Sequence, residues 1–89
     1  MGEVNGFEIQ FKSSALRELE GLPRQVVRLM FPRIQALALD PRPAGCRKLQ
    51  GGVNHWRIRV GEYRVIYTVD DRKRAVEILR IRNRENAYD

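Results

Sequence analysis

The stretch of sequence that decides the fold is Trp56-Arg57-Ile58-Arg59-Val60-Gly61-Glu62-Tyr63-Arg64-Val65-Ile66-Tyr67. Apolar and polar residues alternate on both sides of Gly61-Glu62, and this alternation is typical of half-buried strands. A two-residue connection with glycine in first place favours a type II′ turn. The stretch therefore predicts an antiparallel hairpin.

The turn also fixes which residues face each other across this hairpin. Val60 would face Tyr63, and Arg59 would face Arg64. The residues predicted to share the core face are Trp56, Ile58, Val60, Tyr63, Val65 and Tyr67. The opposite face would carry Arg57, Arg59 and Arg64, although like charges directly across a sheet cost a few tenths to about 1 kcal/mol. An unfavourable pairing of this kind often marks a functional surface. The alternative is that this face of the sheet is exposed to solvent and tolerates arginine.

Upstream of the hairpin, the pattern predicts one strand and two helices. Residues Phe7–Lys12 alternate like a strand, and Ser13 or Ser14 is expected to cap a short helix over Ala15–Glu20. Leu16 and Leu19 would face inward from that helix, which Gly21 would end.

A second helix is expected to begin at Pro23 and to run for about four turns. Its apolar stripe consists of Val26, Met30, Ile34 and Leu37, widened by Val27 and Phe31. Pro32 lies in the middle of this segment and is expected to kink or split the helix, because proline lacks the backbone donor.

After a loop at Asp40–Gly45, Lys48-Leu49 is expected to begin a strand, and Ala75–Arg82 forms the last one. The predicted class is α+β with the order β-α-α-β-β-β in a single domain over residues 1–89. Two N-terminal helices would pack on a small, twisted, mostly antiparallel sheet.

The position of Arg80 and Arg82 depends on the length of the charged turn around Asp71–Arg74. A four-residue turn would place both arginines on the core face, where a charged group is costly. A five-residue turn would place them on the Arg64 face, and we expect this longer turn. Arg84 and Tyr88 would follow just beyond that face.

The composition and the uneven charge of the chain indicate which kinds of partner it binds. The chain has 89 residues and a formal net charge of +6, and residues 41–89 hold twelve basic and six acidic side chains. Residues 1–40 are balanced, so the whole excess lies in the second half. A one-sided excess favours a polyanion such as nucleic acid, although an acidic protein partner also fits.

Side chains that ligate metals or form catalytic triads are scarce. Cys46 and His55 are the single cysteine and histidine. Together they cannot make a zinc site, and no triad is supported, so we expect no metal and no cofactor. The polar N-terminus is unlike a secretory signal, no run is apolar enough to span a membrane, and a reducing, cytoplasmic setting fits.

The arginine-bearing face favours single-stranded RNA. Guanidinium groups bind phosphate oxygens in pairs, and a ring such as that of Tyr88 can stack on an unpaired base. No predicted helix is basic enough to act as a recognition helix for duplex DNA.

The segments Lys48–Gly51, Trp56–Tyr67 and Val76–Tyr88 resemble the RelE branch of the RelE/ParE toxin superfamily. The predicted strand and two helices fit the layout of that family as well. The resemblance implies a toxin that cuts mRNA in the ribosomal A site without metal, by attack of a ribose 2′-OH on the adjacent phosphate. It also implies a cognate antitoxin, expected to offer an acidic, partly helical segment.

The resemblance carries over to particular residues. It implies catalytic roles for Arg59, Arg64, Arg84 and Tyr88. The residues expected to bind RNA are Lys48, Arg57, Arg59, Arg80 and Arg82. Arg64 and Arg84 would stabilise charge on the phosphate oxygens, and Tyr88 would stack on a base, or orient or deprotonate the 2′-OH.

Two departures from the family pattern concern the chemistry. Asn83 stands where many relatives have histidine, so an acid–base role is excluded at that position. Arg57 and Arg59 stand where the best-known branch often has lysine. Both departures fit an enzyme whose site is completed by the ribosome, or a protein whose catalysis is weak. The alternative is a ParE-like inhibitor of gyrase that cuts no RNA, and the Arg84–Tyr88 pair favours RelE.

Overall fold

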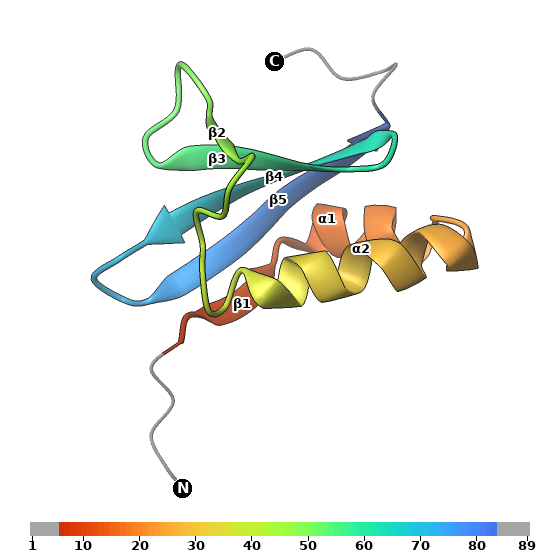
Figure 1. Cartoon of the computed structure of the whole chain (residues 1–89), viewed down its shortest axis with the longest axis horizontal. Helices are drawn as coiled ribbons and strands as arrows, with labels where there is room; N and C mark the ends of the chain where they lie inside the picture. The colour runs from red at the N-terminus through yellow and green to blue at the C-terminus, as the bar shows by residue number, and fades with distance from the viewer. Residues whose placement is uncertain (1–5, 84–89) are drawn as a thin grey trace, which may run out of the picture.

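Two helices and five strands make up the structure, a computed structural model that describes residues 6–83. The elements are β1 (Glu8–Phe11), α1 (Ser13–Glu20), α2 (Arg24–Ala36), β2 (Arg47–Lys48), β3 (His55–Val60), β4 (Tyr63–Asp70) and β5 (Ala75–Asn83). The α+β class is confirmed, and the short β2 adds a fifth strand at the predicted Lys48 region. Both helices lie on the same side of the sheet (Figure 1).

The five strands form one sheet in the order β1-β5-β4-β3-β2. β1 runs parallel to β5, whereas the other neighbours are antiparallel, so the sheet is mostly antiparallel as predicted. The predicted hairpin register is confirmed, with Val60 opposite Tyr63 and Arg59 opposite Arg64. Gly61 takes a φ of 59°, which is the left-handed conformation that the tight turn requires.

The core lies between the helices and the face of the sheet that they cover. Its largest fully buried side chains are Tyr67, Met30, Ile34, Leu37, Ile58, Ile78, Val65, Val69 and Val76. The predicted core face is thus correct, although Trp56 and Tyr63 are only partly buried at its margin. We call the opposite side of the sheet the outer face.

The first helix differs from its prediction at its start and on its inner side. It begins at Ser13, with Lys12 at the N-cap and no side-chain cap, so the expected serine cap is wrong. Ala15 and Leu19 are its buried residues, whereas Leu16 is 41% exposed. Ala15 and Leu19 are four residues apart and form the inward side, so the predicted inward position of Leu16 is wrong.

The second helix passes through Pro32 as one continuous element from Arg24 to Ala36, so it is not split. Pro32 is exposed. Because proline has no N–H, the carbonyl group of Arg28, four residues earlier, loses its helical hydrogen bond, and Arg28 is exposed as well. Met30 and Ile34 anchor the opposite, buried side of the helix on both sides of the proline.

The turn between β4 and β5 has four residues, so the expected five-residue turn is wrong. Asp70 pairs with Ala75, and the register then shifts by one residue between Ile66 and Tyr67. Tyr67 pairs with Ile78 while Ile66 pairs with Arg80, which leaves Leu79 as an extra residue. This β-bulge moves the residues that follow it to the other side of the strand. Arg80 and Arg82 therefore lie on the outer face, where the longer turn was expected to place them.

The loop between α2 and β2 is fixed to the sheet by polar contacts. The Tyr67 hydroxyl donates to the Pro41 carbonyl oxygen at 2.7 Å, and burial raises the pKa of this tyrosine. Arg42 bonds both carboxylate oxygens of Asp71, at 2.7 and 3.2 Å, and this hydrogen bonding lowers the pKa of Asp71. The Arg42 guanidinium also lies 5.1 Å from the centre of the Trp56 ring. These contacts join the loop to β3, to β4 and to the turn after β4.

Candidate functional site

Three arginines lie in one row across the outer face, close to the Gly61-Glu62 turn. Arg59 on β3 pairs with Arg64 on β4, and Arg64 pairs with Arg82 on β5. Arg59 and Arg64 are one step from the closing pair of the hairpin, so they form a pair without backbone hydrogen bonds, in which Cα atoms approach to about 4.5 Å. Arg59 and Arg82 are exposed and Arg64 is partly buried. We call this set the first arginine row.

A second row lies two residues further from the hairpin turn. Arg47 on β2 pairs with Arg57 on β3, Arg57 pairs with Ile66 on β4, and Ile66 pairs with Arg80 on β5. Arg57 is only 7% exposed, so it presents little of its surface to a ligand. Arg47 was not among the predicted site residues, because nothing in the ambiguous segment before β3 indicates how β2 is paired. We call this set the second arginine row.

Lys48 lies on the other side of the sheet from these rows. It pairs with Trp56, which belongs to the core side, and its ammonium group is 5.9 Å from the centre of the Trp56 ring. The lysine expected to join the RNA-binding arginines thus has its ammonium group near Trp56, while the residue also lines a hollow together with Arg47 and Arg57. Arg47, its neighbour in the chain, occupies the outer face instead.

A carboxylate from α1 supports the strand that carries Arg82. Glu18 accepts a hydrogen bond from the backbone N–H of Ile81 at 2.8 Å through Oε1. Its other oxygen lies 3.8 Å from Nε of Arg82. Because β1 ends at Phe11, which pairs with Ile78, the later part of β5 has no strand beside it there. Glu18 satisfies a backbone donor on that open edge.

The charge changes sign along the outer face. The arginine rows lie toward the turn at Gly61-Glu62, whereas the opposite end of β5 carries Glu77, paired with Thr68 on β4 and with Gln10 on β1. Positive charge is thus concentrated at one end. β5 ends at Asn83 on that same end, and Arg84 and Tyr88 lie outside the described residues.

A hollow of about 360 Å³ adjoins the second arginine row on the outer face. Its lining consists of Leu49, Gln50, Gly51, Gly52, His55, Ile66, Leu79 and Arg80. A second hollow beside it is lined by Arg47, Arg57 and the Lys48–Gln50 segment. The site therefore combines rows of guanidinium groups with two hollows that are partly apolar. Single-stranded nucleic acid would require both, because its phosphates are charged and its bases are flat and apolar on their faces.

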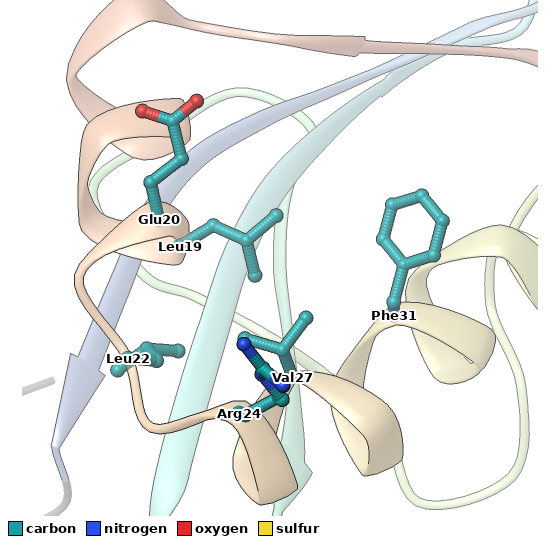
Figure 2. A pocket seen from close by; sticks show the side chains of 6 residues that line it. All are labelled: Leu19, Glu20, Leu22, Arg24, Val27 and Phe31. Atoms are coloured by element: carbon teal, nitrogen blue, oxygen red, sulfur yellow. The ribbon is translucent and has the colours of Figure 1, made fainter.

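A different concave surface lies between the helices. Leu19, Val27 and Phe31 point toward this groove, and Leu22, Glu20 and Arg24 complete its lining (Figure 2). The groove has a volume of about 550 Å³ and a mainly apolar lining. It belongs to the helical side of the molecule, so it is separate from the arginine rows.

Residues 6–83 contain neither a cluster of metal-ligating side chains nor a helix suited to cross a membrane. No three His, Cys, Asp or Glu side chains come together there in a way that could hold a metal ion. Neither of the two helices in that range is long and apolar enough to cross a membrane.

The fold and the arginine-bearing face define a small basic α+β protein with a surface suited to a polyanion. The family described as ParE toxin of type II toxin–antitoxin systems matches residues 9–88, a span that includes the positions of Arg84 and Tyr88. The chain belongs to this family of toxins.

Individual relatives carry RelE names. A protein of Methanocaldococcus jannaschii named toxin RelE1 is 29% identical over 85 residues, which cover 92% of this chain and 94% of that protein. The RelE–RelB complex of Pyrococcus horikoshii has a TM-score of 0.80 at 27% identity, covering 91% of this chain and 98% of that one. RelBE2 of Mycobacterium tuberculosis gives 0.77 at 26% identity, with 89% and 99% covered. These relatives make the chain a RelE-like member of the RelE/ParE superfamily.

Proposed function

We propose that this RelE-like toxin is an endoribonuclease that cleaves mRNA in the ribosomal A site and so stops translation. The observation that carries the proposal is the first arginine row, in which Arg59, Arg64 and Arg82 come from three adjacent strands. A sheet places these groups on a rigid support, and fixed positive groups stabilise developing negative charge without having to reorganise.

In the proposed reaction, the 2′-oxygen of a ribose attacks the neighbouring phosphorus and forms a cyclic 2′,3′-phosphate. The bond from phosphorus to the 5′-oxygen breaks, the 2′-OH gives up its proton, and the leaving 5′-oxygen gains one. The charge on the phosphate oxygens increases in the transition state. Arg64 and Arg84 are proposed to stabilise it, and Tyr88 is proposed to stack on a base, or to orient or deprotonate the 2′-OH.

The remaining arginines are proposed to hold the RNA backbone. Arg59 and Arg82 flank Arg64 within the first row, and Arg80 belongs to the second row, where the nearly buried Arg57 is proposed to add positive charge beneath the RNA rather than a broad contact. Arginine remains charged near neutral pH, so Arg59 is a better phosphate clamp than a proton donor. Arg47 joins this set because it pairs with Arg57, and Lys48 stays in it because it lines a hollow together with Arg47 and Arg57.

An antitoxin partner is also proposed. The Pyrococcus and Mycobacterium neighbours come from complexes of a toxin with an antitoxin. For this chain we propose a partner with an acidic, partly helical segment, because its carboxylates would be complementary to the arginine rows. Covering those rows would keep RNA away from them.

The test is primer extension on an mRNA in a reconstituted translation system, with and without ribosomes. Wild type is compared with Arg64→Ala and Arg84→Ala, and Arg28→Ala is the matched control, since Arg28 is exposed on α2. We expect cuts within A-site codons that require ribosomes, disappear in the first two variants and persist in the control. Removal of a single preorganised donor typically costs about 100- to 1,000-fold in rate.

A gyrase-inhibiting toxin is the second candidate, because the matching family is named for ParE. If the protein arrests growth but produces no cuts in mRNA, the nuclease proposal is wrong. Inhibition of DNA supercoiling by purified gyrase would then support the second candidate. The RelE names of the relatives favour the nuclease.

A further inference from the structure

We infer that the hollow beside the second arginine row is a binding site for a single nucleobase of the RNA. The inference rests on the proposed function, because it assigns a subsite to the same RNA. The hollow is recessed into the outer face between the loop after β2 and the strands β4 and β5.

The walls of the hollow suit a flat heterocycle. Ile66, Leu79 and Leu49 supply apolar surface, and the rest of the lining includes His55 and Arg80. A volume of about 360 Å³ lies near the lower end of the roughly 300–1,000 Å³ typical of small-ligand sites. Apolar walls with a few polar groups are the usual composition of such sites, and a base offers both a flat apolar face and a polar edge.

The β-bulge brings Arg80 to the same side of the sheet as these walls. Without an extra residue, the side chains of β5 would alternate strictly, and Arg80 would lie on the core side opposite Val65. Because the register shifts after Ile78, Leu79 is the extra residue, half-buried beside Ile66, and Arg80 follows it on the outer face. Bulges are over-represented beside functional sites, where they redirect a side chain.

His55 is held in one orientation at the edge of the hollow. Its Nδ1 lies 3.0 Å from the Val53 carbonyl oxygen, and because that oxygen can only accept, Nδ1 carries the proton. The ring lies so close to Gly52 that a Cβ there would come within 2.5 Å of Nδ1. The loop is closed by a hydrogen bond from the Leu49 N–H to the His55 carbonyl at 2.9 Å. With Nδ1–H donating to the Val53 carbonyl, the uncharged form of the ring offers Nε2 as an acceptor.

This tautomer gives the subsite a preference among bases. An acceptor pairs with an exocyclic amino group, which adenine, cytosine and guanine carry and uracil lacks. We therefore expect adenine or cytosine to bind better than uracil. The arginine rows adjoin the hollow, so the phosphates of the same strand would lie along them while one base is turned into it.

The test uses the full chain and small probes. The four ribonucleoside 5′-monophosphates and ribose 5-phosphate are titrated separately while the imidazole NMR signals are recorded. His55 is the single histidine, so these signals need no assignment. We expect the nucleotides to shift them and to bind at least about fivefold more tightly than ribose 5-phosphate, which corresponds to the low end of measured base-stacking energies.

Two variants and one control isolate the hollow. Leu79→Gln keeps the size of the wall but makes it polar, and it should bring the affinities for nucleotide and ribose 5-phosphate close together. His55→Phe keeps a ring but removes Nε2, and calorimetry should show that the preference for AMP and CMP over UMP is lost. Leu29→Ala removes a leucine that is 69% exposed on α2, and it should change neither result.

Equal binding of ribose 5-phosphate and nucleotides, or nucleotide binding that ignores Leu79→Gln, would overturn the base site. The mRNA cleavage assay reports separately on the proposed function. Cleavage of mRNA without base-dependent binding would refute the base site alone. Base-dependent binding without cleavage would refute the nuclease and support the base site.

Discussion

Glu18→Ala should loosen the end of β5 that carries Arg82. The wild-type carboxylate accepts a hydrogen bond from the Ile81 N–H at 2.8 Å in a partly buried position. Hydrogen bonds to a charged group contribute about 1.5–3 kcal/mol. The contact with Arg82, at 3.8 Å, joins side chains that are 31% and 43% exposed, so it adds less than about 1 kcal/mol. The expected loss of unfolding free energy is therefore about 2–3 kcal/mol.

Thermal unfolding followed by circular dichroism measures this loss. For a domain of this size, 1 kcal/mol corresponds to about 4–8 °C, so Tm should fall by roughly 10–20 °C. Glu18→Gln should lose less, because the amide oxygen still accepts from the backbone donor. Glu20→Ala is the matched control, since Glu20 is an exposed glutamate on the same helix.

Amide hydrogen exchange decides whether the loss arises at the proposed place. Exchange of the Ile81 amide should accelerate in Glu18→Ala more than exchange of Val69, whose amide hydrogen bond lies elsewhere, with the Asn54 carbonyl. If Tm and Ile81 exchange match those of wild type, Glu18 does not support β5 and the argument is refuted. A fall in Tm without faster Ile81 exchange would also contradict it, because the stabilisation would then come from another contact.

Four other outcomes follow from the structure. Tyr67→Phe should lower stability by about 1–3 kcal/mol in denaturant titrations, because the buried Pro41 carbonyl loses its donor. Wild type should also lose stability as the pH rises above about 10, since burial raises the pKa of Tyr67 in the folded state and only the unfolded state ionises at that pH; Tyr67→Phe should lack this part of the pH dependence. Trp56→Ala should unfold the domain or cost about 3 kcal/mol, and a variant that is merely inactive and fully stable would count against the packing described. Deletion of Leu79 should still give a folded protein by circular dichroism, because Arg80 then pairs with Ile66 without a bulge; an unfolded product would show that the bulge itself is required.

The sequence predicts the hairpin well because its register is a local property. Gly61-Glu62 permits a two-residue turn, and once the turn is set, each pair from Val60–Tyr63 outward is determined. The partial burial of Trp56 and Tyr63 was not predictable from alternation, because burial at the margin of a sheet depends on which helix residues reach it. The start of α1 was missed for a similar reason, since Lys12 takes the cap position although serines follow.

The arginine face depends on two features that local patterns do not determine. β2 has only two residues, and its pairing alone decides that Arg47 lies on the outer face and Lys48 beside Trp56. A five-residue turn would have put Glu77 opposite Val69 on the core face and turned Val76 and Ile78 outward. The bulge at Leu79 keeps both apolar residues in the core, but only the pairing of β5 with β4 shows where the extra residue lies.

The choice between turn and strand nevertheless has different consequences for function. A longer turn would have placed Arg80 and Arg82 on the same face at no cost to the regularity of β5. The bulge places the same arginines there and also leaves Leu79 half-buried beside Ile66, where it lines the hollow next to the second arginine row. Because the core requires the extra residue to follow Ile78, Leu79 is also available on the outer face as an apolar wall beside the guanidinium groups. A phosphate-binding face alone would not need such a wall, whereas a face that also receives a base would.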